Sequence, residues 1–467
     1  MSCSWLRPAP RWTSSGRTPT AETGSRPPRP VGRGRMANGR RISSGASKNA
    51  AGTGKQARRS SQRPIGAGGR LRADPDGGID GGDFAAFTGI RSLLNPLWCY
   101  HGFIVAVLVL CCFGVIMVFS SSSVTLVSAG KSPWNRAIKQ GLYCVIGLGL
   151  AFVASRMRPK FFEKFSPVIM LAALGLQALT LTPLGTGGEE TGNNGWIVLG
   201  PIQLQPAEMT KLALCLWLPF ALQRASKRFS REGVRAYMMP GLIFALSLGL
   251  ILLGKDLGTG MIVVFIGVVA FMVAGFPFKW MAVFTGVLAA GVIGLAITSP
   301  NRMNRILAAY KPCTDLEGVC WQSMHAKYAL AEGGLLGVGL GNSREKWNYL
   351  PEAHTDFIYA IIGEETGFVG ALTVLLLFVV IGWSLICVAL QIRERYVAMS
   401  LICIAVWIVG QALVNIGVVI GIFPVLGVPM PFVSSGGSSM IMCLGAAGAA
   451  VGMMRCQPQI KAERVAL

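Results

Sequence analysis

Several acids and a histidine lie together between positions 350 and 365, directly before a long apolar run. The run continues from Phe368 to Leu390 without a charge and is long enough to cross a bilayer. The residues predicted to lie at or just inside one membrane face are Glu352, His354, Asp356, Glu364 and Glu365. An acid at the centre of a bilayer costs about 2.5–3.5 kcal/mol, so Glu364 and Glu365 are predicted to face a water-filled space between helices and not lipid.

Asp356 is open to two interpretations. It could line that polar space and act on a ligand. It could instead be a helix N-terminal acid stabilised by the helix dipole, because His354 and Thr355 before an apolar run are typical of a helix start. Residue type alone favours neither interpretation.

The composition is that of a protein that crosses a membrane many times. Of the 467 residues, 52% are hydrophobic and only 14% are charged. We therefore expect an all-α integral membrane protein of ten transmembrane helices, with a large extracytoplasmic loop between the seventh and eighth helices. The apolar runs cover about 101–120, 137–155, 167–183, 209–222, 237–254, 257–275, 279–299, 366–390, 396–420 and 436–455.

Both ends of the chain are predicted to lie outside this membrane domain, which spans residues 98–456. Residues 1–97 contain 17 Lys and Arg against 5 Asp and Glu, and are expected to form a disordered cytoplasmic tail. A basic tail beside a membrane span is expected to meet anionic lipid headgroups. It carries no aromatic interleaving or motif for nucleic acid, which is not an expected partner. Residues 457–467 form a second, short tail.

The basic residues also predict the orientation in the membrane. They gather in the loops after the second, fourth and eighth runs, so the positive-inside rule places these loops and both termini in the cytoplasm. The opposite, outer face then carries the loops 121–136, 184–208, 300–354 and 421–435, with Asp356 beside them.

Charged pairs occupy two places on that outer face. Prolines and glycines around Trp196 exclude a plain helix, and Glu208 and Lys211 lie one helical turn apart. This stretch is expected to form a re-entrant or interfacial turn, or else a loop anchored by Trp196 in which the two charges neutralise each other. Lys255 and Asp256 lie in a tight turn between two runs, and a simple turn is the alternative interpretation there.

Two further groups on the outer face favour an anionic ligand. Arg302 is one of several cations in the loop 300–354, on the face where the positive-inside rule disfavours them. Ser434 and Ser438 belong to a Gly- and Ser-rich segment whose amides and hydroxyls could cradle an anion. Together with the acids, these groups predict a site for a phosphorylated substrate approached from the membrane.

Cys313 and Cys320 share the large outer loop. Because the outer face is oxidising, we expect them to form a disulfide, with two free thiols as the alternative.

Five ordered motifs between residues 98 and 456 resemble those of the SEDS family of shape, elongation, division and sporulation proteins. Within that family the cell-division branch is more similar than the rod-shape branch. The motifs are Trp196-Ile197 with Gln205 to Lys211, Asp256 to Thr259, Gly339 to Ser343, Tyr349 to Tyr359 with Gly363 to Glu365, and Pro431 to Ser439.

The resemblance implies a glycosyltransferase that polymerises lipid II into peptidoglycan outside the cytoplasmic membrane, for septal cell-wall synthesis. It implies Asp356 as the catalytic base, and Lys211, Arg302 and Lys255 as candidates for holding pyrophosphate. A divalent cation, Mg²⁺ or Mn²⁺, is a candidate cofactor. The implied partners are a class b penicillin-binding transpeptidase and other membrane proteins of the division machinery. The remaining candidate substrate-binding residues are Trp196, Glu208, Asp256, Glu352, His354, Ser434 and Ser438.

The chain departs from the family pattern at several positions. Lys255 stands where proline is common, Ser435 replaces a tyrosine, His325 replaces a glutamine, and Asn194-Gly195 replaces an arginine. Because of these changes, the family pattern does not settle which residues of this chain bind the anion. A lipid II flippase, a non-catalytic division scaffold and a role in elongation stay as alternatives, and a scaffold would tolerate the loss of Asp356.

Overall fold

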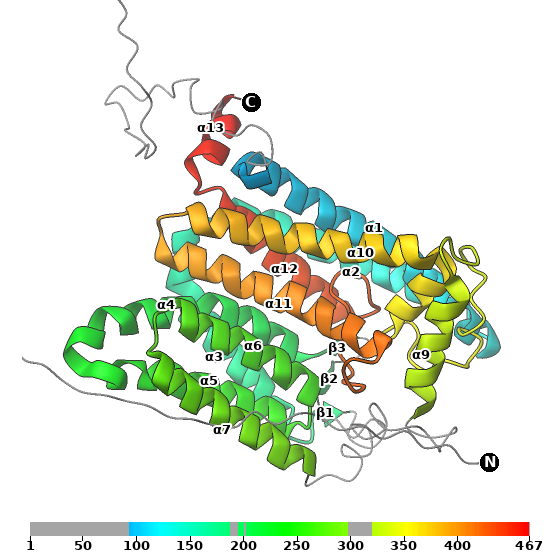
Figure 1. Ribbon diagram of the computed structural model, residues 1–467, viewed down its shortest axis with the longest axis horizontal. Helices are drawn as coiled ribbons and strands as arrows, with labels where there is room; N and C mark the ends of the chain where they lie inside the picture. The colour runs from blue at the N-terminus through cyan, green and yellow to red at the C-terminus, as the bar shows by residue number, and fades with distance from the viewer. Residues whose placement is uncertain (1–92, 187–194, 200–201, 298–319, 467) are drawn as a thin grey trace, which may run out of the picture. The chain divides into compact units, whose positions relative to one another are not determined.

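The computed structural model describes residues 93–186, 195–199, 202–297 and 320–466. These residues are mostly helical, as Figure 1 shows, with the long helices packed side by side. The long helices are α1 (Pro96–Ser128), α2 (Asn135–Arg156), α3 (Pro159–Leu179), α4 (Pro206–Glu232), α5 (Met238–Leu253), α6 (Leu257–Val273), α7 (Phe278–Ile297), α10 (Ile358–Gln391), α11 (Arg395–Ile420) and α12 (Gly437–Met454). Shorter helices are η3 (Gly233–Tyr237), α9 (Cys320–Gly333) and α13 (Pro458–Ala466).

Seven helical stretches of the described chain are long and apolar enough to cross a membrane, which confirms the multi-pass helical class. One of them, Pro206–Leu253, comprises the consecutive elements α4, η3 and α5, and Gly233, with φ +59°, ends α4. The others are α1, α2, α3, α10, α11 and α12, and α6 is a shorter apolar helix.

Four helices extend well beyond the apolar runs that predicted them. One is α1, which covers Pro96–Ser128 where the run 101–120 was expected. The helix α10 begins at Ile358, two turns before the expected position 366, because the acids Glu364 and Glu365 are buried against protein partners. The helix α3 begins at Pro159, and α4 continues to Glu232 through an exposed basic stretch. Charged residues on long side chains can extend a membrane helix into the headgroup region, so apolar runs underestimate helix length.

Two elements were not expected from the sequence. A small antiparallel sheet contains β1 (Gly185–Thr186), β2 (Trp196–Leu199) and β3 (Ile202–Leu204), and it leads directly into α4, which has Pro206 at its first turn. The second element is α9, inside the large loop. Figure 1 shows α9 and the strands toward the same end of the bundle as the start of α10.

Small residues hold α2 and α12 in close contact. A side chain at Gly448 would overlap the backbone of Ala151, and one at Gly147 would overlap Leu444. Close approach through small residues is a common way to associate helices in membranes. The first turn of α2 therefore lies against the loop that precedes α12.

The helix α10 is interrupted at Gly367, which has φ +68° and ψ −170°. The interruption leaves the carbonyls of Glu364 and Glu365 to accept hydrogen bonds from the amides of Val338 and Gly339, both at 3.0 Å. These two hydrogen bonds attach the glycine-rich loop that contains Val338 and Gly339 to α10.

Candidate active site at the start of α10

Asp356 lies two residues before α10 and is half-buried. Its backbone carbonyl accepts a hydrogen bond of 2.7 Å from Asn415 Nδ2 on α11, and the same amide donates to the carbonyl of Val428 at 2.7 Å. Its carboxylate lies beside Gly427, where an added Cβ would be 3.6 Å from Oδ2. Gly427 has φ +68°, a conformation that favours glycine. The backbone of Asp356 is therefore fixed by α11 and the loop 422–436.

The loop 422–436 also binds the two residues before Asp356. Ser434 Oγ donates to the carbonyl of Thr355 at 2.6 Å and accepts from the amide of Met430 at 2.8 Å. The amide of Ser435 donates to the carbonyl of His354 at 2.9 Å. Ser434, a predicted site residue, is thus brought to Asp356, where it orders the backbone.

His354 makes a side-chain contact that the sequence did not predict. Arg136 Nη1, in the first turn of α2, lies 2.5 Å from His354 Nε2. Arginine has only donors, so Nε2 must be the acceptor of a neutral imidazole. Burial and the charge of Arg136 lower the pKa of His354 to about 4, although Glu352 partly opposes this shift. The signal in the sequence was a cation at the start of an apolar run, on the face predicted to be outer, where the positive-inside rule disfavours it.

Glu352 forms the turn that leads to Asp356. Its carbonyl accepts from the amides of Thr355 at 3.1 Å and Phe357 at 3.3 Å, and its Oε2 accepts from Thr355 Oγ1 at 2.7 Å. Glu352 has φ +56°, which is strained for a residue with a side chain. The other described non-glycine residues with positive φ are Lys255, Asn348 and Phe432. Strain of this kind collects at functional sites.

Asp256 and Ser438 are linked through a third residue, Gln205. Asp256 is the N-cap of α6: its Oδ1 accepts from the amide of Thr259 at 3.0 Å, and its Oδ2 accepts from Gln205 Nε2 at 3.3 Å. The amide of Gln205 donates to Ser438 Oγ at 3.2 Å. Lys255, next to this cap, is exposed. Asp256 therefore has the partners of a capping residue.

Glu208 and Lys211 form an ion pair inside the bundle. Lys211 Nζ lies 2.8 Å from Glu208 Oε1 and 2.7 Å from Gln411 Oε1, and it stands 5.5 Å from the centre of the Trp407 ring. Both charged side chains are about 1% exposed. The predicted spacing of one turn is observed, and the arrangement matches the interpretation in which the two charges neutralise each other. Trp196 is half-buried in β2.

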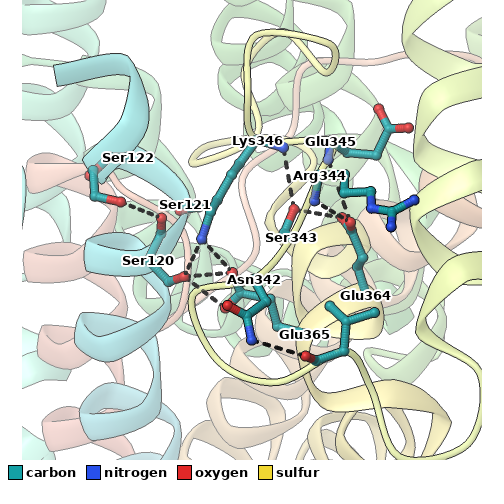
Figure 2. A network of polar contacts seen from close by, with 12 residues as sticks. Ser120, Ser121, Ser122, Asn342, Ser343, Arg344, Glu345, Lys346, Glu364 and Glu365 are labelled. Carbon is teal, nitrogen blue, oxygen red and sulfur yellow. Dashed lines mark hydrogen bonds and ion pairs between the residues drawn. The ribbon is translucent and has the colours of Figure 1, made fainter. Parts of the chain in front are cut away.

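The acids of α10 belong to a buried network, shown in Figure 2. Lys346 Nζ pairs with Glu365 Oε1 at 2.9 Å, and Ser120 Oγ on α1 donates to the same carboxylate at 2.6 Å. Ser343 Oγ donates to Glu364 Oε2 at 2.6 Å. The two acids avoid lipid, as expected, but they are buried against protein partners. The network attaches the loop before Asp356 to α1 and α10.

Some predicted residues lie outside the described part of the chain. Arg302 and Cys313 are two of these. Cys320 is disulfide-bonded, and the other described cysteines are free. The pairing of Cys320 with Cys313 stays a prediction. No group of three or more His, Cys, Asp or Glu that could hold a metal ion occurs among the described residues, and the divalent cation also stays a prediction.

Comparison with known proteins identifies relatives across this membrane domain. A probable peptidoglycan glycosyltransferase FtsW of Nitrosococcus halophilus is 38% identical over 333 residues, covering 70% of this chain and 85% of the relative. The rod shape determining protein RodA of Thermus thermophilus has a crystal structure that matches with a TM-score of 0.57 at 27% identity, covering 78% of this chain and 97% of that one. A chain of a peptidoglycan synthase complex matches with a TM-score of 0.60 at 27% identity, covering 77% and 98%.

Residues 101–456, which include all of the site described above, match the family of cell cycle proteins that comprises FtsW, RodA and SpoVE. The match covers well over half of the chain and agrees with the motifs noted in the sequence. The chain therefore belongs to this FtsW, RodA and SpoVE family.

Proposed function

We propose that this protein is a peptidoglycan glycosyltransferase that polymerises lipid II at the outer face of the cytoplasmic membrane. Relatives named as probable peptidoglycan glycosyltransferases support this activity. The observation that carries the proposal is Asp356, a half-buried carboxylate whose backbone is fixed by Asn415 at the start of α10. A carboxylate held in this way suits a general base.

In the proposed reaction Asp356 takes the proton from the 4-hydroxyl of the acceptor sugar. That oxygen attacks the anomeric carbon of the donor, a glycosidic bond forms, and the bond to the lipid pyrophosphate breaks. The leaving pyrophosphate is stabilised by positive charge, for which Arg302 and the exposed Lys255 are the candidates. A divalent cation such as Mg²⁺ or Mn²⁺ would add positive charge there when bound.

The proposal includes a topology of ten passes with both termini in the cytoplasm. Ten passes result when α4 and α5 are separate spans and α6 and α7 cross as well. The exposed basic residues at the end of α4 support a cytoplasmic position for that end. With this orientation Asp356, the strands and α9 lie on the outer side.

We further propose a class b penicillin-binding transpeptidase as partner and the division septum as the place of action. The likeness to a chain of a complex that coordinates polymerisation and crosslinking supports the first point, and the names of the FtsW relatives support the second. Other membrane proteins of the division machinery, and anionic lipids for the tail 1–97, complete the expected partners.

The test is single-turnover polymerisation of purified lipid II by the purified protein, with and without its partner. Asp356→Asn keeps the side-chain shape but cannot accept the proton, so the rate should fall by about 10²–10⁴-fold while lipid II binding persists. The matched control, Glu332→Gln, changes an exposed carboxylate on α9 and should retain most of the rate in folded protein. Near-normal turnover by Asp356→Asn would refute the base assignment. Transport of lipid II without polymer would indicate a flippase.

A further inference from the structure

The helix α2 is held at its outer end by contacts with the segment before α12. Gln140 Nε2 donates to the carbonyl of Ser434 at 3.1 Å, and Gln140 Oε1 accepts from the amide of Gly436 at 3.3 Å. The ring of Tyr143 packs on Gly437, where an added Cβ would overlap it. The backbone of Arg136, one turn before Gln140, is therefore fixed relative to the loop that binds the turn before Asp356.

The side chain of Arg136 joins α2 to that turn through His354. Its Nη1 lies 2.5 Å from His354 Nε2, across 218 positions of sequence. Since the guanidinium can only donate, the bond requires Nε2 without a proton, and the imidazole proton lies on Nδ1. Protonation of His354 would break this bond and place two cations against each other.

The charged groups around His354 come from few elements. Arg136 faces it from α2, while Glu352 and Asp356 belong to its own turn. The loop 422–436 and the helix α12 carry no Asp, Glu, Lys, Arg or His, and bind the turn through backbone and serine groups. Arg136 is thus the nearby cation that opposes a positive charge on His354.

We propose that Arg136 is a positioning residue for the glycosyl transfer: its guanidinium holds His354 neutral and fixes the turn that carries Asp356. This inference rests on the function proposed above. An imidazolium in that turn would favour the charged form of Asp356 and so weaken it as a base. It would also be repelled by Arg136 and displace the turn. With Arg136 in place, neither change occurs over the ordinary working range of pH.

The titration of His354 tests this inference without any activity assay. The chain contains only three histidines, His101, His325 and His354, so isotope-labelled imidazoles can be resolved by NMR and assigned with a His354→Gln variant. In the full-length protein His354 should stay neutral from pH 8 to 5. In Arg136→Met its pKa should rise by at least about one unit toward the ordinary value near 6.5. Arg136→Lys, which keeps the charge, should resemble the unaltered protein.

The pH profile of lipid II polymerisation provides the functional test. Arg136→Met should lose rate between pH 7.5 and 5.5, relative to unaltered protein, in step with the fraction of His354 that takes up a proton. The loss is about 1.3-fold for a pKa of 5 and about tenfold if the pKa reaches the ordinary value near 6.5. Adding His354→Gln to Arg136→Met should remove this extra pH dependence. Lys139→Gln, an exposed change on the same helix, is the matched control and should leave the profile unaltered.

An unchanged His354 titration in folded Arg136→Met would overturn the inference. An unchanged pH profile of polymerisation in Arg136→Met, when the NMR titration shows a raised pKa of His354 in that variant, would also overturn it. If the unaltered protein makes no polymer at all, the proposed function fails, yet the NMR titration still decides whether Arg136 controls His354.

Discussion

Asn415 donates its side-chain amide to the backbone carbonyl of Asp356 at 2.7 Å, which ties the C-terminal end of α11 to the residue proposed as the base. The same amide reaches the carbonyl of Val428, so one side chain joins two segments of the site. Asp356 is in this way ordered before any substrate arrives. Such preorganisation reduces the entropy lost in reaching the transition state.

Replacing Asn415 should therefore affect stability and rate together. In Asn415→Leu two buried carbonyls lose their donor, which should lower the free energy of unfolding by about 1–3 kcal/mol. The polymerisation rate of the folded fraction should also fall. Asn415→Asp should be worse, because an acceptor would face both carbonyls. Denaturant unfolding and single-turnover rates measure the two effects, and full activity in Asn415→Leu would contradict the role of this bond.

The network of Lys346 and Glu365 should contribute mainly to stability. Lys346→Met leaves the Glu365 carboxylate buried without its cation, and breaking a buried pair costs about 3–5 kcal/mol. Adding Glu365→Gln should recover much of this loss, because no buried charge then remains. Unfolding measurements on the single and double variants test this, with the exposed Lys131→Met as control. Equal stability of Lys346→Met and Lys131→Met would disprove the prediction.

Variants of Lys211 distinguish the role that the family resemblance implies, which is contact with pyrophosphate, from the ion pair with Glu208 that the structure shows. Lys211→Met should destabilise the protein by about 3–5 kcal/mol, because Glu208 would remain buried and unpaired. Combining it with Glu208→Gln should restore stability. If Lys211 acts only through this ion pair, the double variant should also recover polymerisation. A stable but inactive double variant would instead support direct contact with pyrophosphate.

Acid should destabilise the protein through His354. Its pKa is about 4 in the folded protein and near 6.5 when unfolded, so the unfolded state binds more protons between these values. Stability should consequently fall as the pH is lowered from about 6.5 to 4, by roughly 2–3 kcal/mol from this residue.

The measurement for this prediction is the free energy of unfolding against pH, compared with that of His354→Gln. The comparison cancels Glu345, whose pKa is raised by burial and which contributes with the opposite sign. Parallel curves for the two proteins would show that His354 does not cause the slope.

The sequence predicted the helical class and the acid at the start of α10, because apolar runs and intramembrane charges are signals within single segments. The turn formed by His354 and Asp356, and the serine-rich loop that binds it, were also identified in advance. Their hydrogen-bond partners were not, since Asn415 and Arg136 come from distant segments. The resemblance likewise suggested that Lys211 holds pyrophosphate. In the structure Glu208 neutralises it, and Gln411, 200 residues away, accepts a second hydrogen bond from it.

The interruption of α10 restricts how this part of the chain can vary. Gly367 and Gly337 both have positive φ, and a Cβ on either would overlap the backbone next to the other. A larger residue at one position cannot be compensated at the other, because both collisions are with main-chain atoms. The fold therefore requires both glycines, although they are thirty positions apart. In a library of random variants, every folded member should retain glycine at both positions.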